Sequence, residues 1–181
     1  MFKNINLIHF IIISSFIFFP SCTKESITNQ VSKEGMPDQE SWGVNITLTD
    51  GGIIRAKVES GHLAKYSDNA SLLLDSNIIV DFYDKDEQHT STLTSFRAEV
   101  NQNSNDMKAS GNVIATSDSG ITLFSESLTW LSVSEKLYTK DSIMITTIEG
   151  DTIYGIGFES DSDLKNWKII QPSGVTGKEY K

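Results

Sequence analysis

GNVIATSDSGITLFSESLTW, residues 111–130, is the stretch of sequence that decides the fold class. Apolar residues recur between polar ones on both sides of a tight turn at Gly120, and this spacing is typical of half-buried β-strands. The stretch holds no His, Cys or Lys, and its only Glu is Glu126. It therefore predicts a β-hairpin that carries no obvious catalytic group.

The same alternation runs through the chain from Trp42 onward. A turn at residues 50–52 separates two runs of this kind, as expected for a hairpin. No segment between residues 42 and 171 has a convincing helical period. Expected strands cover residues 43–49, 53–66, 77–84 and 91–102. With 181 residues, the chain is long enough for one domain of moderate size, and its fold class is predicted to be all-β.

The strands also repeat. A shift of thirty residues superposes MKASGNVIATSDSGITLF (107–124) on LYTKDSIMITTIEGDTIY (137–154). The superposition pairs Val100 with Trp130, Met107 with Leu137, Val113 with Ile143, Gly120 with Gly150, and Phe124 with Tyr154. A meander of antiparallel strands can show such similarity by chance. The paired glycines and aromatic residues favour a true repeat of hairpin units, each too small to bury its own apolar face.

The N-terminus resembles a bacterial lipoprotein signal. Residues 5–19 are almost wholly apolar, and this run is shorter than the roughly 20 residues that span a bilayer. Cys22, the only cysteine, follows where a signal-peptide cleavage site belongs. We therefore expect residues 1–21 to be removed and Cys22 to carry a lipid anchor, with a transmembrane anchor as the alternative. Both interpretations place the rest of the chain beyond the inner membrane and tethered to a membrane.

Downstream of the signal, the composition divides the chain into three parts. The polar residues 22–41 are expected to form a flexible tether, residues 42–172 the periplasmic β-domain, and residues 173–181 a polar C-terminal tail. The chain carries 15 Lys and Arg against 24 Asp and Glu. This acidity argues against a nucleic-acid partner and against broad electrostatic binding to anionic lipids, so membrane attachment is assigned to the anchor.

Catalytic or metal-binding patterns are not found in the sequence. His62 and His89 fall in different expected elements, and no Cys or His completes a zinc site. The acidic residues of 84–87 lack the spacing of an EF-hand loop, and no serine lies in a Gly-x-Ser-x-Gly turn. Asp161 and Asp163 are interpreted as solvated turn residues. No metal or cofactor is expected, and the sequence offers no positive case for an enzyme.

Apolar surface is the property that remains. A β-sheet folded into a groove would present its inward residues as an apolar trough, which acyl chains favour because their burial yields about 25 cal/mol per Å². The same residues could instead pack against one another as the closed core of a sandwich. Composition alone does not separate these two arrangements.

Four strings in this order resemble the LptC family, the membrane-anchored periplasmic component of the lipopolysaccharide export machinery. They are GNVIAT, SGITLFSESLTW, LYTKDSIMITT and GIGFESDSDLKNWKI, and the resemblance covers about residues 42–172. A lipid anchor in place of a transmembrane helix is a departure from the family's best-studied form. The family favours the inner membrane as the site of the anchor.

The resemblance implies an open, elongated antiparallel β-jellyroll whose groove receives the acyl chains of lipopolysaccharide. It implies two partners: an inner-membrane ABC transporter complex that supplies the lipid, and a soluble periplasmic jellyroll protein that receives it by edge-strand pairing. The alternating apolar positions are the candidates for the groove, namely Val100, Met107, Val113, Leu123, Trp130, Leu137, Ile143, Ile145 and Phe158. Gly155 and Gly157 allow a close backbone approach or a bulge, or are ordinary strand glycines.

Two other function classes stand beside the lipid conduit. The first is a surface or periplasmic lipoprotein with a β-sandwich that binds carbohydrate or protein. A sugar-binding module should display an aromatic platform, whereas Trp42, Trp130 and Trp167 are dispersed in the sequence. The second is an envelope hydrolase, which the lack of a catalytic triad or metal set in the sequence disfavours.

Overall fold

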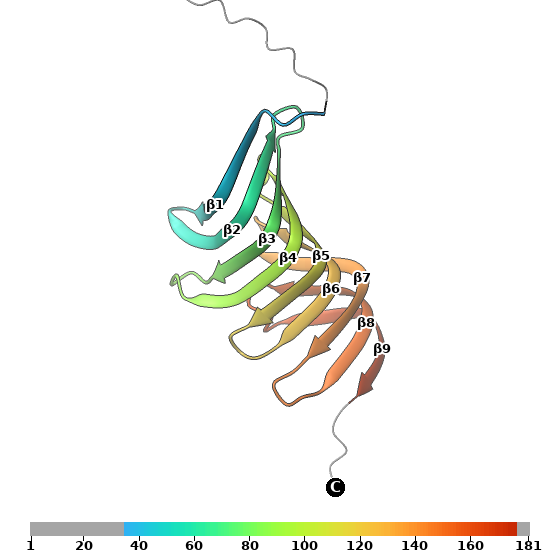
Figure 1. Cartoon of the computed structure of the whole chain (residues 1–181). Helices are drawn as coiled ribbons and strands as arrows, with labels where there is room; N and C mark the ends of the chain where they lie inside the picture. The colour runs from blue at the N-terminus through green and yellow to red at the C-terminus, as the bar shows by residue number, and fades with distance from the viewer. Residues whose placement is uncertain (1–34, 177–181) are drawn as a thin grey trace, which may run out of the picture. The chain divides into compact units, whose positions relative to one another are not determined.

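A computed structural model of the chain describes residues 35–176, which form one antiparallel sheet of nine strands in sequence order (Figure 1). The strands are β1 (Gln39–Asp50), β2 (Ile53–Tyr66), β3 (Ser71–Tyr83), β4 (His89–Asn101), β5 (Met107–Ser117), β6 (Thr122–Leu131), β7 (Lys136–Thr146), β8 (Thr152–Asp161) and β9 (Trp167–Thr176). The sheet is not closed, because β1 and β9 each pair on one side only. The all-β prediction is confirmed. The expected signal peptide (1–21) and Cys22 lie outside the described residues.

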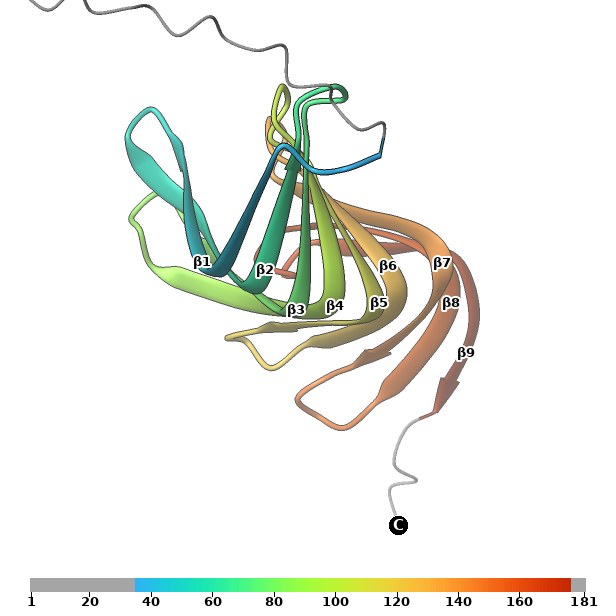
Figure 2. The ribbon, with the colours of Figure 1, turned by 45° about the horizontal axis from the view of Figure 1, so that its top comes forward.

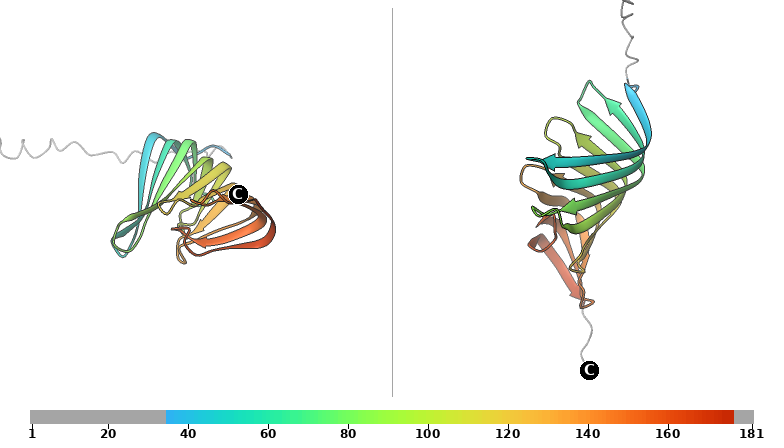
Figure 3. Two further views of the ribbon diagram at one scale, coloured as in Figure 1. Left: turned by 90° about the horizontal axis from the view of Figure 1, so that it is seen from below. Right: turned by 90° about the vertical axis from the view of Figure 1, so that its left-hand side faces the viewer.

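Each strand from β2 to β8 is interrupted near its middle. The pairing register shifts at the same level in successive strand pairs from β2–β3 to β7–β8: at residues 59/62, 75/78, 94/97, 110/113, 125/129 and 139/142. A further shift, at 154/155 between β8 and β9, lies nearer the turn at residues 147–151. Bulges bend strands and increase their local twist. The aligned shifts therefore crease the sheet, and Figures 2 and 3 show the strands curving along this line.

Two kinds of local chemistry build the crease. In β2, β4 and β6, a serine hydroxyl donates to the carbonyl two residues later: Ser60 to His62 at 2.6 Å, Ser95 to Arg97 at 3.0 Å and Ser125 to Ser127 at 2.8 Å. In β3 and β5, the backbone turns left-handed at Asn77 (φ 65°) and Asn112 (φ 50°). Asn tolerates this conformation better than most residues.

The crease divides the sheet into two limbs that face each other. The first limb consists of the strand halves that end at rim 1, the turns at residues 51–52, 84–88, 118–121 and 147–151. The second limb consists of the halves that end at rim 2, the turns at residues 67–70, 102–106, 132–135 and 162–166. We call the gap between the two rims the mouth.

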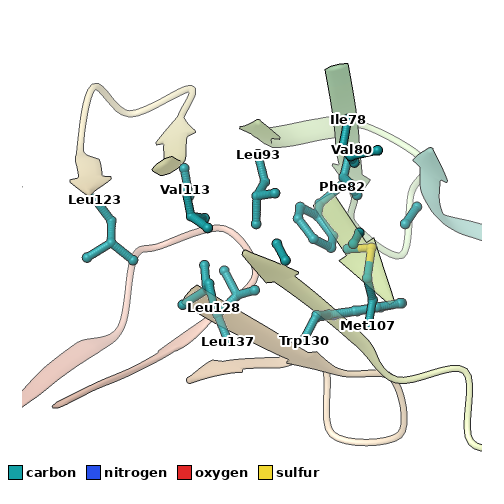
Figure 4. Close-up of a cluster of buried hydrophobic side chains, with 14 of the residues drawn as sticks. Ile78, Val80, Phe82, Leu93, Met107, Val113, Leu123, Leu128, Trp130 and Leu137 are labelled. Carbon is teal, nitrogen blue, oxygen red and sulfur yellow. The ribbon is translucent and has the colours of Figure 1, made fainter. Parts of the chain in front are cut away.

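The core fills the space between the limbs. Figure 4 shows Val113, Leu123 and Phe82 of the first limb pointing toward Leu128 and Trp130 of the second. Phe82 and Trp130 make an edge-to-face contact with ring centroids 5.5 Å apart, a geometry that aromatic pairs prefer. The open jellyroll expected from the sequence is confirmed as a creased, unclosed sheet.

The thirty-residue repeat is visible in the turns of rim 1. Ser117 N–H donates to Ile121 O at 2.9 Å, and Thr147 N–H donates to Asp151 O at 3.0 Å. Gly120 (φ 88°) and its predicted counterpart Gly150 (φ 89°) take the same left-handed conformation. The turn at 84–88 has the same bond, from Asp84 N–H to Gln88 O at 2.9 Å. The repeat is thus confirmed, and it extends to a third hairpin.

Both expected boundaries of the β-domain need correction. β1 begins at Gln39 rather than at residue 42, because Gln39 pairs with Lys65 of β2. β9 continues to Thr176 rather than ending at residue 172, because Thr176 pairs with Thr152 of β8. Backbone pairing with a neighbouring strand, rather than apolar alternation, sets both ends.

Candidate functional site

All nine predicted groove residues lie on the inner face of the creased sheet, and each is at most 4% exposed. Val113, Leu123, Ile143 and Ile145 belong to the first limb. Val100, Met107, Trp130, Leu137 and Phe158 belong to the second. The structure therefore brings the nine residues together as parts of two facing walls. In this state they contact other side chains and leave no open trough.

The sequence prediction omitted the walls contributed by β2 and β3 and, apart from Val100, the wall contributed by β4. The omitted residues are equally buried and include Val58, Leu74, Ile78, Val80, Phe82 and Leu93. The signal was present, because NIIVDFYD (77–84) alternates and places Ile78, Val80 and Phe82 on one face. The interior thus occupies more of the sheet than the candidate positions suggested.

Leu164 is the one core residue in the described range that comes from a turn, and it was not predicted. It lies in the rim 2 turn between β8 and β9, is fully buried, and has φ 57°. The other rim 2 turns carry a left-handed residue at the matching place: Ala70 (φ 52°), Asn105 (φ 59°) and Glu135 (φ 55°). A bulky residue in this conformation is uncommon and strained, so its position needs compensating contacts. Leu164 gains them by closing the interior at the mouth.

Two polar contacts join the rims across the mouth. The Arg55 guanidinium, from the first limb, pairs with the Glu135 carboxylate of rim 2. Ser91, also from the first limb, donates its hydroxyl to the Ser162 carbonyl of rim 2 at 2.5 Å. Arg55 is 9% exposed, so its guanidinium is largely shielded from water, whereas the Glu135 side chain is 35% exposed. Together with Leu164, these contacts hold the limbs together.

A second ion pair stabilises rim 2. Lys136 Nζ lies 2.5 Å from Asp161 Oδ1, and the amide of Asn166 donates to the same carboxylate at 2.8 Å. These donors, Lys136 foremost, lower the pKa of Asp161 below its ordinary value. The same hydrogen bond raises the pKa of Lys136. Asp161 is therefore an ion-pair partner rather than only a solvated turn residue. Asp163 accepts from Lys165 N–H within the turn, as expected of a turn residue, and its carboxylate also pairs with Lys165 Nζ at 3.3 Å.

The histidines lie outside the interior. His62 packs against Trp42 with ring centroids 5.3 Å apart, and its Nδ1 lies 3.2 Å from Asp75. His89 Nδ1 lies 3.0 Å from Asp118. Within residues 35–176, no group of three or more His, Cys, Asp or Glu side chains is arranged to hold a metal ion. The acidic residues at 84–87 belong to a turn instead, which Asp84 stabilises by accepting a hydrogen bond from the backbone N–H of Gln88.

The three tryptophans do not form a common surface. Trp42 in β1 is 71% exposed, Trp130 in β6 is 2% exposed, and Trp167 at the start of β9 is half-buried. They lie on strands that are not neighbours in the sheet. The aromatic platform of a sugar-binding module is therefore not built by these residues.

Gly155 and Gly157 have specific structural roles. A Cβ atom at Gly155 would lie 2.3 Å from a methyl of Ile169 and 2.8 Å from the Gln171 carbonyl, which real side chains do not tolerate. Gly157 has φ 75°, a conformation that favours glycine. Gly155 therefore allows the close approach of β8 and β9, and it also lies at the register shift between these two strands, so both the close approach and the bulge that the sequence left open are seen at this position.

The arrangement offers an apolar interior and two unpaired strand edges. The buried polar side chains of the described range are Arg55 and the hydroxyls of Ser60, Ser71, Ser91, Ser95, Ser117, Thr139 and Ser160. An open edge presents backbone N–H and C=O groups that another strand can pair with. The site is thus suited to holding apolar material and to strand addition.

Comparisons with known proteins agree with this geometry. Residues 7–177 match the family described as "Lipopolysaccharide-assembly, LptC-related". Among solved structures, LptH of Pseudomonas aeruginosa, "the LptA homologous periplasmic component of the conserved lipopolysaccharide transport device", is similar in fold, with a TM-score of 0.51. The two chains are 11% identical, and the similarity covers 70% of this chain and 89% of LptH. A search of curated proteins finds no match.

One further observation concerns the membrane. From residue 35 to residue 176, the chain has no helix of the length and apolar character needed to cross a bilayer. The family match extends over most of the sequence, well beyond the strings that first suggested it. The chain belongs to the LptC-related family of lipopolysaccharide-assembly proteins.

Proposed function

We propose that the chain is a bridge component of lipopolysaccharide transport that holds the acyl chains of its cargo between the two limbs. The extent of the apolar interior carries this proposal. Buried apolar residues line it in every strand from β2 to β8, and half-buried Val44 in β1 and Ile169 in β9 extend it to both free edges. A path that reaches both edges suits a cargo that is passed along unchanged.

The physical basis of cargo binding is exchange of one apolar contact for another. The limbs now bury each other's side chains, and an acyl chain inserted between them would replace those contacts with its own. Each buried methylene group contributes about 0.8 kcal/mol, so a chain of ordinary length can offset the parting of the limbs. Acyl chains need no polar partner, in keeping with walls of Val, Leu, Ile and Phe.

We further propose that the two free edges bind the transport partners. An inner-membrane ABC transporter complex would supply lipopolysaccharide, and a soluble periplasmic protein of the same fold would accept it. Pairing of β9 or β1 with a partner's edge strand would make two apolar interiors continuous. The support is the open sheet, in which both edge strands pair on one side only.

The location follows from the same proposal. We place the domain in the periplasm, anchored to the inner membrane through lipidated Cys22. Cys22 lies outside residues 35–176, so the support for the anchor is the sequence pattern alone. The acidic composition also supports a lipid anchor, because a chain of net charge −9 has little general electrostatic attraction to anionic lipid and needs another means of membrane attachment.

Photo-crosslinking from inside the limbs tests the conduit. A p-benzoylphenylalanine at Phe158, which is 2% exposed, is expected to capture lipopolysaccharide in cells with a working transporter. The matched control is the same probe at Tyr154, an aromatic residue of the same strand that is 41% exposed. Capture at Tyr154 alone, or at neither site, would show that the cargo does not pass between the limbs.

A second crosslinking experiment tests the edge. A probe at Ile170 of β9, which is 52% exposed, is expected to yield a covalent adduct with the soluble jellyroll partner. Glu99 is exposed too, but it lies on β4, which is paired on both sides, and it serves as the control position. Equal adduct yields at the two positions would contradict edge pairing at β9.

A further inference from the structure

A cavity of about 390 Å³ lies at the mouth beside Arg55. From the first limb and rim 1 it is lined by Leu48, Thr49, Asp50 and Arg55. From the second limb and rim 2 it is lined by Asn103, Ser104, Asn105, Trp130, Ser132 and Val133. It therefore spans the gap between the rims at one side of the Arg55–Glu135 ion pair.

Two buried N–H groups belong to side chains that line this cavity. Arg55 Nε and Trp130 Nε1 are both shielded from solvent, and neither has a hydrogen-bond partner among residues 35–176. A buried donor without an acceptor costs about 1–3 kcal/mol, and more when it is charged. Two such donors beside one cavity indicate that an acceptor belongs there.

Charge identifies the kind of acceptor. The cavity on the other side of Arg55 carries five carboxylates, from Asp84, Asp86, Glu135, Asp161 and Asp163, against the cationic groups of Arg55, Lys85 and Lys165. The 390 Å³ cavity carries one carboxylate, from Asp50, beside Arg55. The first cavity is therefore net negative and the second is neutral overall, so an anion is favoured in the second, where Arg55 supplies a guanidinium that binds phosphate well.

The lining is also amphiphilic. Leu48 and Trp130 connect the cavity to the core, where Trp130 touches Phe82. Val133 lies at its outer lip and is 93% exposed. A ligand bound here could place a charged group against Arg55 while its apolar part continued between the limbs. A free inorganic anion would use only the first of these features.

We propose that this cavity is a subsite for the phosphate group of an acylated amphiphile, and that the phosphate displaces Glu135 from Arg55 as the limbs part. The inference rests on the proposed function, because the apolar part of such a ligand needs the interior. It adds a headgroup contact that the apolar walls do not require. The Arg55–Glu135 pair then closes the mouth when no cargo is bound.

The test uses two variants that break the same ion pair. The full chain, in neutral detergent, is titrated with bisphosphorylated lipid A and with lipid A from which both phosphates have been removed, and binding is followed by tryptophan fluorescence. Arg55→Met is expected to weaken binding of the bisphosphorylated lipid about tenfold. Because it also breaks the pair that closes the mouth, it is expected to leave binding of the dephosphorylated lipid unchanged or tighter. Glu135→Gln, which frees Arg55, is expected to tighten binding of the bisphosphorylated lipid.

The subsite predicts that the two variants change the affinity for the bisphosphorylated lipid in opposite directions. If both variants shift binding of both lipids in the same direction, the pair is only structural and the proposal is wrong. Inorganic phosphate that displaces the lipid would show a site for free anions and would also overturn it. Should Arg55→Met fail to fold, Glu135→Gln decides alone, and unchanged or weaker binding counts against the subsite.

The result also separates this proposal from the conduit itself. Equal binding of both lipids by all variants, together with lipopolysaccharide capture at Phe158, removes the headgroup subsite and leaves the conduit standing. Failure of every variant and of the unmodified chain to bind either lipid contradicts the conduit.

Discussion

Ile143→Asp is expected to lower the free energy of unfolding of the domain by about 4 kcal/mol or more. Ile143 is 4% exposed on β7, where it pairs with Ser125 of β6 and Gly155 of β8. A carboxylate at this position would be buried without a partner between two apolar walls. Because domains of this size are stable by only about 5–15 kcal/mol, the variant would lose a large fraction of its stability.

Urea unfolding followed by circular dichroism measures this effect. Ser142→Asp is the matched control, since Ser142 precedes Ile143 on the same strand and is exposed. It adds the same charge and is expected to change stability by no more than about 0.5 kcal/mol. If the two variants unfold at the same urea concentration, Ile143 does not lie in a dry interior.

The inner face of the sheet was predictable because side chains in strands alternate with a period of two. Met107, Val113 and Leu123 were identified from this period alone, and the structure places them on one face. A bulge can reverse this parity within a strand. The crease does so in β4, where the buried residues change from Leu93 to Val100, and in β6, where they change from Leu123 to Trp130. In β5 and β7 the buried residues keep one parity on both sides of the crease.

The full length of β3 was not predictable from the same signal. The sequence indicated a strand from residue 77, whereas β3 begins at Ser71. Ser76 and Asn77 are left-handed, and such a polar pair is typical of a turn. Here the pair bends a continuous strand at the crease, because its neighbours β2 and β4 pair with both halves.

The mouth was beyond sequence prediction for a different reason. Arg55, Glu135 and Leu164 are far apart in the chain and meet only when the crease brings rim 1 and rim 2 together. Leu164 lies within the polar string SDSDLKNW, which carries no alternation. Its role depends on a strained backbone that opposes local preference, and conflicts of this kind mark functional positions more often than structural ones.

A covalent link across the mouth is expected to abolish lipopolysaccharide capture. Ser91 and Ser162 already contact each other through the hydroxyl and the carbonyl, 2.5 Å apart, so cysteines at these positions can be joined by a disulfide or a short bis-maleimide. With the limbs joined, an acyl chain cannot replace the side chains between them. The probe at Phe158 should then capture no lipopolysaccharide, and reduction of the disulfide should restore capture.

The controls separate the position of the link from the chemistry of forming it. Each single-cysteine variant reports on pairing with another molecule. Asp38 and Ser67 provide a matched pair at rim 2, where Ser67 N–H donates to the Asp38 carboxylate at 2.6 Å. A link between those two positions joins neighbouring segments on one side of the mouth, leaves the limbs free to part, and should leave capture at Phe158 intact.

The cross-mouth link also resolves the question that composition left open, whether the buried residues form a closed sandwich core or a lipid path. If the buried residues form a closed core, the link does not disturb them and raises the stability of the domain, because a disulfide that restrains the unfolded chain typically adds about 2–4 kcal/mol. A lipid path is blocked by it. A linked chain that is more stable and still captures lipopolysaccharide at Phe158 would therefore show that the cargo reaches Phe158 without the limbs parting at the mouth, whereas a linked chain that is more stable and captures none identifies the space opened between the limbs as the path. If the apolar walls part to carry lipid, the link must raise the stability of the domain and abolish lipopolysaccharide capture at the same time.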